Sequence, residues 1–238
     1  MVAKIPPNKL QQLFKIVKNP LTLIFASRPW PWMGIGIPLL GFQQLAGQVE
    51  QNPEVLNWDT AILFAIHDSA GTELDRIAAT LTHLGSLWIL LPVTIAIALV
   101  YAWQQQWRFA AYLIVAELSN GLLNAIAKGW IHRLRPDLWE PIHHPVTDYA
   151  FPSGHAMSSM TFATTLIILT WETRWRGWTI ALSSLLVLIV GWTRLYLGVH
   201  FPSDILGGWI LGIAWSCILA QLFQIPLSQA VEDSEATS

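Results

Sequence analysis

Long apolar runs separated by short polar turns make up most of this sequence after residue 86. Such runs constrain the fold strongly, because a helix needs about 20 mostly apolar residues to cross the ~30 Å hydrocarbon core of a bilayer. Of the 238 residues, 53% are hydrophobic and only 12% are charged. A soluble domain of this size cannot bury so much apolar surface in one core. The sequence therefore predicts an integral membrane protein built from helices.

Six apolar runs are predicted to span the membrane, of which the first is the weakest because Pro38 and several glycines interrupt it. The predicted spans are Pro31–Ala46, Leu87–Trp103, Phe109–Ala127, Ala156–Trp171, Trp178–Trp192 and Ile205–Phe223. Two segments between residues 48 and 85 repeat apolar residues at helical spacing and are expected to be amphipathic helices lying against the membrane. The predicted fold class is all-α: a polytopic membrane helix bundle of about six transmembrane helices plus amphipathic interfacial helices.

The two ends of the chain differ from its middle. Residues 1–28 carry five basic residues among apolar ones at helical spacing, which is typical of a basic amphipathic helix on a membrane surface. Residues 29–224 contain the predicted spans, and residues 225–238 form an acidic tail. We therefore expect one membrane domain between an amphipathic N-terminal segment and a polar C-terminal tail.

Lysine and arginine predict the orientation, because loops on the cytoplasmic side are enriched in them. With the N-terminus inside, eight of the thirteen fall on the inner side and five on the outer side. Both termini are therefore expected in the cytoplasm. The compact loops are typical of a bacterial inner membrane, and a eukaryotic organelle is the alternative.

This topology places three polar stretches on the same outer side, the first at the end of the third span. Lys128 and Arg135 are seven residues apart, so in a continuous helix they would share one face about 10 Å apart. Two cations there would attract an anion. The alternative is a positive flank that extends to the interface.

The second stretch begins the fourth span. Ser153 is a residue type favoured at a helix N-cap, and Gly154 lets the backbone approach a ligand. Free N–H groups and the positive end of the helix dipole favour a phosphate there. His155 follows in the first turn, where it could hold or deliver a proton. An ordinary capped helix start is the alternative interpretation.

The third stretch joins the last two spans. Pro202 suits the first turn of a helix, and a helix that begins there brings Asp204 within reach of His200. A histidine held by a carboxylate has a fixed tautomer and stays basic enough to act as a nucleophile or a base. Arg194 adds a fork of donors suited to phosphate. Interfacial residues near a membrane boundary are again the alternative.

Taken together, the three stretches resemble the pattern of the type 2 phosphatidic acid phosphatase superfamily, the lipid phosphate phosphatases. That pattern reads K-x6-R-P, then P-S-G-H, then S-R-x5-H-x3-D. The matching residues are Lys128, Arg135, Pro136, Pro152, Ser153, Gly154, His155, Arg194, His200 and Asp204. Thr193 stands where the family usually has serine, and we expect it to tune the site because it keeps a hydroxyl. Vanadium haloperoxidases share a similar pattern but are soluble.

The resemblance implies a role for each matching residue. It implies that His200 attacks phosphorus to form a phosphohistidine, that Asp204 orients it, and that His155 protonates the leaving group and then activates water. The implied phosphate-binding residues are Lys128, Arg135, Ser153, Gly154 and Arg194. With so many donors no metal or other cofactor is required. The implied substrates are phosphatidic acid, diacylglycerol pyrophosphate, phosphatidylglycerophosphate and polyprenyl pyrophosphate.

Two other functions are compatible with the same pattern. One is a lipid phosphotransferase, in which an acceptor other than water captures the phosphoryl group. The other is a catalytically silent protein that binds or transports lipid, although binding alone does not need both histidines. The net charge of −2 argues against a nucleic-acid partner, and the oligomeric state is left open.

Several further polar residues and glycines receive structural interpretations. Glu117, Asn120 and Asn124 lie at helical spacing in the third span and are expected to face the bundle. Gly207, Gly208 and Gly212 are expected to allow close helix packing. Five residues are interpreted as loop residues, with shaping of the site's entrance as the alternative: His132, Arg133, His143, His144 and Asp148.

Overall fold

The computed structural model describes residues 30–52, 56–139 and 148–225. All regular structure in these residues is helical, which confirms the predicted all-α class. The helices are α3 (Trp30–Gln51), α4 (Asn57–His67), α5 (Thr72–Leu81), the 3-10 helix η1 (Thr82–Gly85), α6 (Leu87–Trp103), α7 (Trp107–Ile131), α8 (Gly154–Thr170), α9 (Arg176–Tyr196) and α10 (Pro202–Leu222). The predicted amphipathic segment 1–28 and residues 226–238 of the predicted tail lie outside the described residues.

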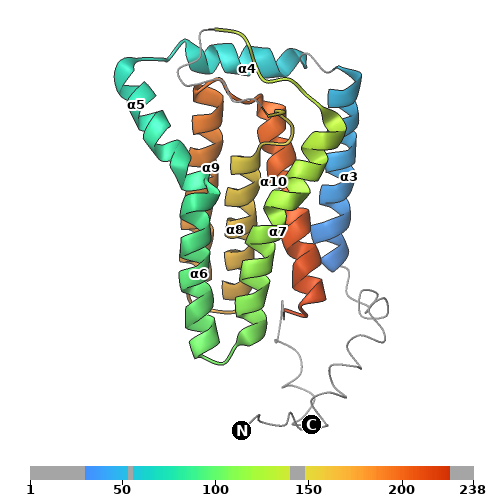
Figure 1. Ribbon diagram of the computed structural model, residues 1–238, viewed down its shortest axis with the longest axis vertical. Coiled ribbons are helices and arrows are strands. Elements are labelled where there is room, and N and C mark those ends of the chain that lie inside the picture. Colours follow the sequence, from blue (N-terminus) through green and yellow to red (C-terminus); the bar gives the residue numbers. More distant parts are fainter. Residues whose placement is uncertain (1–29, 53–55, 140–147, 226–238) are drawn as a thin grey trace.

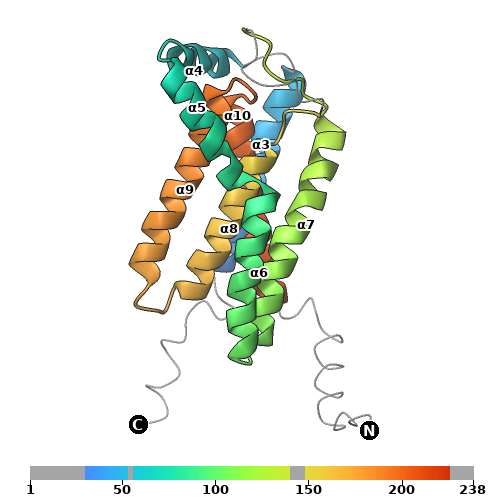
Figure 2. The same ribbon diagram turned by 60° about the vertical axis from the view of Figure 1, so that its left-hand side comes forward.

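The longer helices, α3 and α6 to α10, lie side by side and form a bundle (Figures 1 and 2). α8 packs against α7, α9 and α10. α4 lies across one end of the bundle, and α5 leads from it through η1 to α6 (Figure 1). We call this the α4 end. α3, α7 and α9 finish there, and α8 and α10 begin there.

The helices divide by length into those that can cross a membrane alone and those that cannot. α7, α9 and α10 are long and apolar enough to do so, and α5 with η1 meets the same criterion jointly with α6 across a 45° bend. α6 and α8 have 17 residues each, which corresponds to about 26 Å of helix against a hydrocarbon thickness of ~30 Å. The prediction of a membrane protein is confirmed, whereas the number of six membrane spans stays a prediction.

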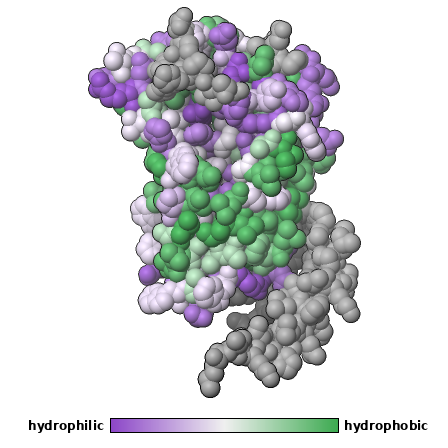
Figure 3. Space-filling model, viewed as in Figure 1, coloured by the Kyte–Doolittle hydropathy of each residue, from purple (hydrophilic) through white to green (hydrophobic). Residues whose placement is uncertain are grey.

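Hydropathy on the surface agrees with a bundle set in a membrane. On the face seen in Figure 3, apolar side chains form a band around the middle and lower parts of the helices, and hydrophilic ones gather at the α4 end. Large apolar side chains such as Leu99, Leu122 and Leu188 are more than half exposed. A continuous apolar surface of this kind is suited to lipid rather than to water.

The two predicted amphipathic helices between residues 48 and 85 are present as α4 and α5. α4 places Trp58 and Ile62 outward but buries Leu63 and Asp59 completely. α5 is tied to α9 because the hydroxyl of Tyr196 donates a hydrogen bond to Asp75 at 2.7 Å. These helices therefore close the α4 end of the bundle and contribute buried groups to it.

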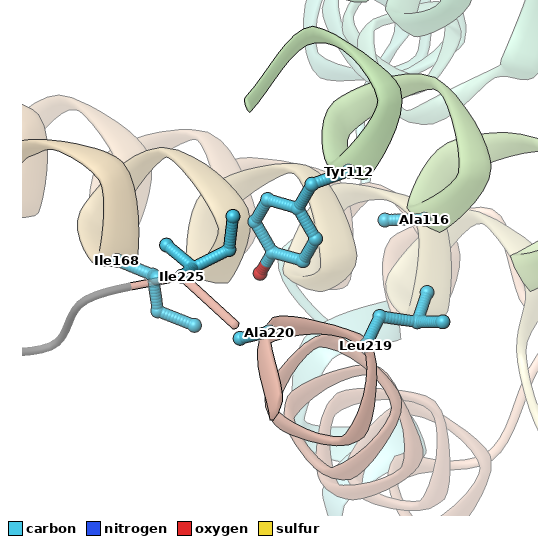
Figure 4. Close-up of a cluster of buried hydrophobic side chains, with 6 residues drawn as sticks. All are labelled: Tyr112, Ala116, Ile168, Leu219, Ala220 and Ile225. Atoms are coloured by element: carbon cyan, nitrogen blue, oxygen red, sulfur yellow. The ribbon is translucent and has the colours of Figure 1, made fainter. Parts of the chain in front are cut away.

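The opposite end of the bundle is held by an apolar cluster around Tyr112 (Figure 4). Side chains from α7, α8 and α10 meet there with Ile225, which lies three residues beyond the end of α10. They are Tyr112, Ala116, Ile168, Leu219, Ala220 and Ile225. The Tyr112 hydroxyl satisfies its polar group by donating to the carbonyl oxygen of Ser216 at 3.1 Å. This cluster fixes α7, α8 and α10 relative to one another, far from the α4 end.

Small residues bring α10 close to α8 at the α4 end, as predicted for Gly208 and Gly212, whereas a Cβ atom on Gly207 would lie 2.6 Å from the ring of Phe151. A Cβ atom on Gly208 would lie 2.7 Å from the carbonyl oxygen of Ser153, and one on Gly212 would lie 3.0 Å from that of Met157. Backbone atoms cannot move aside as a flexible side chain can. The separation between the first turns of α8 and α10 therefore depends on glycine.

Gly208→Ala should lower the stability of the protein by about 1–3 kcal/mol, because the added methyl group forces the two helices apart. The measurement is the midpoint of thermal unfolding in detergent. Gly121→Ala is the matched control, since Gly121 lies within α7 and a Cβ atom there meets nothing within 4 Å. Equal midpoints for the two variants would contradict the close packing described above.

Candidate active site

All three polar stretches singled out in the sequence meet at the α4 end. The first lies where α7 ends, the second where α8 begins, and the third between α9 and α10. Successive helices of the bundle run in opposite directions, so the end of one odd-numbered helix lies beside the start of the next even-numbered one (Figure 2). This alternation brings together residues that are more than 70 positions apart in the chain.

His200 and Asp204 form the pair that the sequence predicts. α10 begins at Pro202, and Asp204 in its first turn accepts a hydrogen bond from the backbone N–H of Phe201 at 2.9 Å. The same oxygen, Oδ2, lies 3.3 Å from Nδ1 of His200. A proton on Nδ1 satisfies this contact, so Nε2 carries the lone pair and is the nitrogen free to react.

Arg135 contacts that nitrogen. Its Nη1 lies 3.1 Å from Nε2 of His200 and donates to the carbonyl oxygen of Val199 at 2.7 Å. Lys128 and Arg135 each form an ion pair with Asp148: Lys128 contacts Oδ2 and Arg135 contacts Oδ1. The two cations therefore converge on one carboxylate beside His200.

Lys128 and Arg135 do not lie on one continuous helix, which is the condition under which they would share a helical face. α7 ends at Ile131, and His132 takes the left-handed conformation with φ 50°, which stops the helix. Residues 133–139 have no helical structure. The two cations meet at Asp148, with which both form ion pairs, and they do not share a helical face.

Arg194 lies in the last turn of α9 and is buried. Its Nη1 donates to the hydroxyl of Thr82 in η1 at 2.9 Å, while its Nε has no partner among the described residues. Thr193 turns its hydroxyl to the carbonyl oxygen of Val190 at 2.7 Å. The hydroxyl at position 193 thus stabilises the end of α9 instead of pointing at a ligand.

Ser153 stands at the N-cap of α8, as predicted, but its side chain makes no capping hydrogen bond. The hydroxyl is buried and has no partner among the described residues. The backbone N–H of Ser153 donates to the carbonyl oxygen of Asp204 at 3.0 Å, which ties the start of α8 to the start of α10. His155 follows in the first turn of α8 and is partly exposed.

The electrostatics of this site favour an anion. Burial lowers the pKa of His200 well below its usual range, and the nearby charges of Arg135, Arg194 and Lys128 lower it further. His200 is therefore neutral near pH 7, the form that a nucleophile needs. Burial opposes ionisation of Asp148, but hydrogen bonds from Lys128 and Arg135 outweigh it and lower the pKa of this carboxyl.

Three residues of this region were missed or misjudged at the level of sequence. Arg133 is fully buried, where a loop residue was expected, and Asp148 pairs with both cations of the first stretch. Asp59, from the distant α4, pairs with Arg133. Residues two positions apart in an extended stretch point to the same side, so the local sequence does not signal that Arg133 and Arg135 have different partners.

The buried polar residues of α7 face the bundle, as predicted. Asn120 donates to the hydroxyl of Ser158 at 2.6 Å, and Asn124 donates to the carbonyl oxygen of Pro152 at 3.1 Å. Glu117 is also buried, with one carboxyl oxygen unpaired among the described residues. Over the same residues, no group of three or more His, Cys, Asp or Glu side chains is placed to hold a metal ion.

The sequence model of the PAP2 superfamily matches residues 109–226. This range begins within α7 and includes all three polar stretches. Phosphatidylglycerophosphatase B of Bacillus subtilis is 32% identical over 146 residues, covering 59% of this chain and 70% of that protein. Undecaprenyl-diphosphatase of Sulfolobus acidocaldarius is 29% identical over 154 residues, covering 62% of this chain and 69% of that protein.

A solved structure shares the fold as well. It is the crystal structure of a transmembrane PAP2 type phosphatidylglycerolphosphate phosphatase from Bacillus subtilis, with a TM-score of 0.67 and 28% sequence identity. The similarity covers 76% of this chain and 92% of that one. The helix bundle thus occurs in a solved membrane phosphatase of the PAP2 type.

Proposed function

Since the chain belongs to the PAP2 superfamily and is an integral membrane lipid phosphate phosphatase, we propose that hydrolysis takes place at the α4 end with His200 as the nucleophile. The observation that carries this proposal is the position of His200. Its Nδ1 lies 3.3 Å from Asp204, and its Nε2 lies 3.1 Å from a guanidinium nitrogen of Arg135. The reactive nitrogen therefore points to where cations would hold a phosphate.

The reaction proceeds in two displacements. Nε2 of His200 attacks phosphorus as the bond to the lipid oxygen breaks, and His155 gives a proton to that oxygen. Asp204 keeps the Nδ1 proton in place and stabilises the charged imidazole. In the second step His155 takes a proton from water, the water oxygen attacks phosphorus, and the bond to His200 breaks to release phosphate.

Protein groups supply the positive charge that the phosphoryl oxygens need. Lys128, Arg135 and Arg194 bind these oxygens and neutralise the charge that grows on them during transfer. The hydroxyl of Ser153 and the backbone N–H of Gly154 add neutral donors at the start of α8. The proposed reaction therefore proceeds without a divalent metal.

The proposed substrate is a lipid with a terminal phosphate, and phosphatidylglycerophosphate is the first candidate. The matched phosphatidylglycerophosphatase B and the solved phosphatidylglycerolphosphate phosphatase support this choice, because each covers a large part of the chain. The matched undecaprenyl-diphosphatase supports a polyprenyl diphosphate as the second candidate. In either case the apolar chain stays among the helices while the phosphate enters the α4 end.

The proposed membrane is a bacterial inner membrane, with both termini in the cytoplasm and the site on the outer side. Of the five cations that this orientation places outside, Lys128, Arg135 and Arg194 belong to the proposed site, and Arg133 is buried behind it. Only Arg76 remains as an exposed cation, paired with Glu73. This distribution strengthens the asymmetry of positive charge on which the orientation rests.

The proposed substrate and products can be tested by measuring phosphate release in detergent with EDTA present. The panel contains phosphatidic acid, phosphatidylglycerophosphate, diacylglycerol pyrophosphate and undecaprenyl diphosphate. We expect release with EDTA, ranked by kcat/KM in favour of phosphatidylglycerophosphate. Transfer of phosphate to an added alcohol in place of water would instead support the phosphotransferase. Release that EDTA abolishes and added metal restores would contradict metal independence.

Asp148→Asn should lower KM and also strengthen inhibition by inorganic phosphate, each by about threefold to tenfold. The reason is that Asp148 pairs with Lys128 and Arg135 and so competes with phosphate for both cations. Asp148 is half exposed, which keeps the expected effect modest. The measurement is KM together with the inhibition constant of inorganic phosphate.

Asp137→Asn provides the matched control, because it makes the same charge change at an exposed carboxylate two residues from Arg135. It should leave both constants near those of the wild type. A rise in KM for Asp148→Asn alone would show the opposite role, in which Asp148 holds Lys128 and Arg135 in place for the substrate.

A further inference from the structure

Arg133 lies behind the candidate site, with its side chain fully buried. One guanidinium nitrogen, Nη1, donates hydrogen bonds to Asp204 Oδ1 and to Ser203 Oγ, both at 2.6 Å. The other, Nη2, donates to Asp59 Oδ2 at 2.8 Å. The guanidinium also lies over the ring of Phe201, 4.3 Å from its centroid. Arg133 therefore connects the start of α10 to α4 through short, charged hydrogen bonds.

Asp59 completes this buried cluster from α4. Its Oδ1 accepts a hydrogen bond from the backbone N–H of Ser203 at 2.9 Å, and its Oδ2 accepts one from the hydroxyl of Ser203 at 2.6 Å. A carboxylate at a helix N-terminus satisfies a free N–H group and interacts favourably with the helix dipole. Asp59 thus holds the first turn of α10 in place, and Asp204 lies in that turn.

Asp204 is the member of the cluster that reaches the site. Arg133 occupies its Oδ1, whereas its Oδ2 accepts from the backbone N–H of Phe201 and faces Nδ1 of His200. The carboxylate cannot turn away from the imidazole without losing one of these contacts. Its orientation is therefore set by Arg133 on one side and by the helix start on the other.

The charges explain why two carboxylates, those of Asp59 and Asp204, contact the same guanidinium. With all three groups ionised, Asp59, Arg133 and Asp204 together carry a charge of −1. If Asp204 were the only partner of Arg133, the guanidinium would cancel most of the negative potential that Asp204 exerts on His200. Such effects are strong where burial keeps the local dielectric low. Asp59 balances Arg133 and leaves the charge of Asp204 to act on the imidazole.

We propose that Asp59 and Arg133 are positioning residues, which orient and charge-balance Asp204 and so act on His200 without touching the phosphate. This inference rests on the roles proposed above for His200 and Asp204. Asp59 lies on α4, outside the residues 109–226 that match the family. α4, which lies across this end of the bundle, therefore contributes to the reactivity of His200.

Three variants test the proposal: Asp59→Asn, Arg133→Gln and the two combined. Asp59→Asn brings the charge of the cluster to zero, Arg133→Gln brings it to −2, and the combination returns it to −1. Each single substitution should lower kcat on the order of 10-fold to 100-fold, less than the roughly 10⁴-fold loss when an orienting aspartate itself is neutralised. KM should change little, because neither residue touches the substrate. The combined variant should have a higher kcat than Asp59→Asn alone.

A purely structural role would give a different result. Loss of buried contacts would lower the unfolding temperature, but kcat per folded molecule would stay close to that of the wild type. Asp75→Asn is the matched control, since it removes a carboxylate on α5 that accepts a hydrogen bond from Tyr196 and lies outside the cluster. It should lower the unfolding temperature and leave kcat unchanged.

The decisive comparison is between Asp59→Asn and the combined variant, so it does not require Arg133→Gln alone to fold. Wild-type kcat in folded Asp59→Asn would overturn the proposal, and so would a combined variant that is less active than Asp59→Asn. In both cases His200→Ala would still be inactive. Failure of the proposed function would be recognised separately, by phosphate release that persists in His200→Ala.

Discussion

Replacing His200 with alanine is expected to lower kcat by on the order of 10³-fold or more, with the protein still folded. The variant removes the nitrogen that forms the bond to phosphorus and leaves the phosphate-binding cations in place. Substrate should therefore still bind, and KM should change far less than kcat. The measurement is phosphate release from phosphatidylglycerophosphate in detergent with EDTA, with the unfolding temperature measured in parallel.

The phosphorylated intermediate gives a second, independent readout of this prediction. A phosphohistidine survives alkali and is cleaved by acid, so substrate labelled in its phosphate should leave alkali-stable, acid-labile label on the wild-type protein and none on His200→Ala. His132→Asn is the control, because it removes an exposed histidine at the end of α7, and asparagine tolerates the φ of 50° there. A folded His200→Ala variant that keeps its label or its activity would contradict the proposed nucleophile.

Hydropathy was sufficient to predict the helices of the bundle. α7, α9 and α10 extend beyond the runs Phe109–Ala127, Trp178–Trp192 and Ile205–Phe223 by only a few residues at most ends, because lipid requires both apolar side chains and internally bonded backbone. The ends were harder to predict. His132 ends α7 through its own left-handed backbone conformation, and neither residue next to it is a glycine or a proline that would predict a helix end.

The residues proposed to carry out the reaction stand out in the sequence, whereas the buried residues that contact them do not. Lys128, His155 and His200 stand in local patterns of fixed spacing, and local spacing is preserved when a helix forms. Asp59 and Arg133 are 74 positions apart and meet only because α4 folds across the end of the bundle. A contact of that kind depends on tertiary packing, which the helical period of either segment does not encode.

His155→Gln should separate the two steps of the reaction when two kinds of leaving group are compared. With a lipid monophosphate, the leaving alkoxide is a strong base and needs a proton, so kcat should fall by about 10²-fold to 10⁴-fold. With a lipid diphosphate, the leaving group is a phosphate, which departs readily without one. The first turnover should then stay fast, and the second step should become slow because no base activates the water.

A burst experiment measures this difference. Mixed with undecaprenyl diphosphate labelled in its terminal phosphate, the variant should release one equivalent of lipid monophosphate per active site in a rapid phase, and the label should appear on His200 in the same phase. Mixed with phosphatidylglycerophosphate, it should show no rapid phase. This contrast arises only if His155 acts first as an acid toward the lipid oxygen and then as a base toward water. Equal slowing of the first turnover for both substrates would assign His155 to phosphate binding instead, since a lost binding group affects both leaving groups alike.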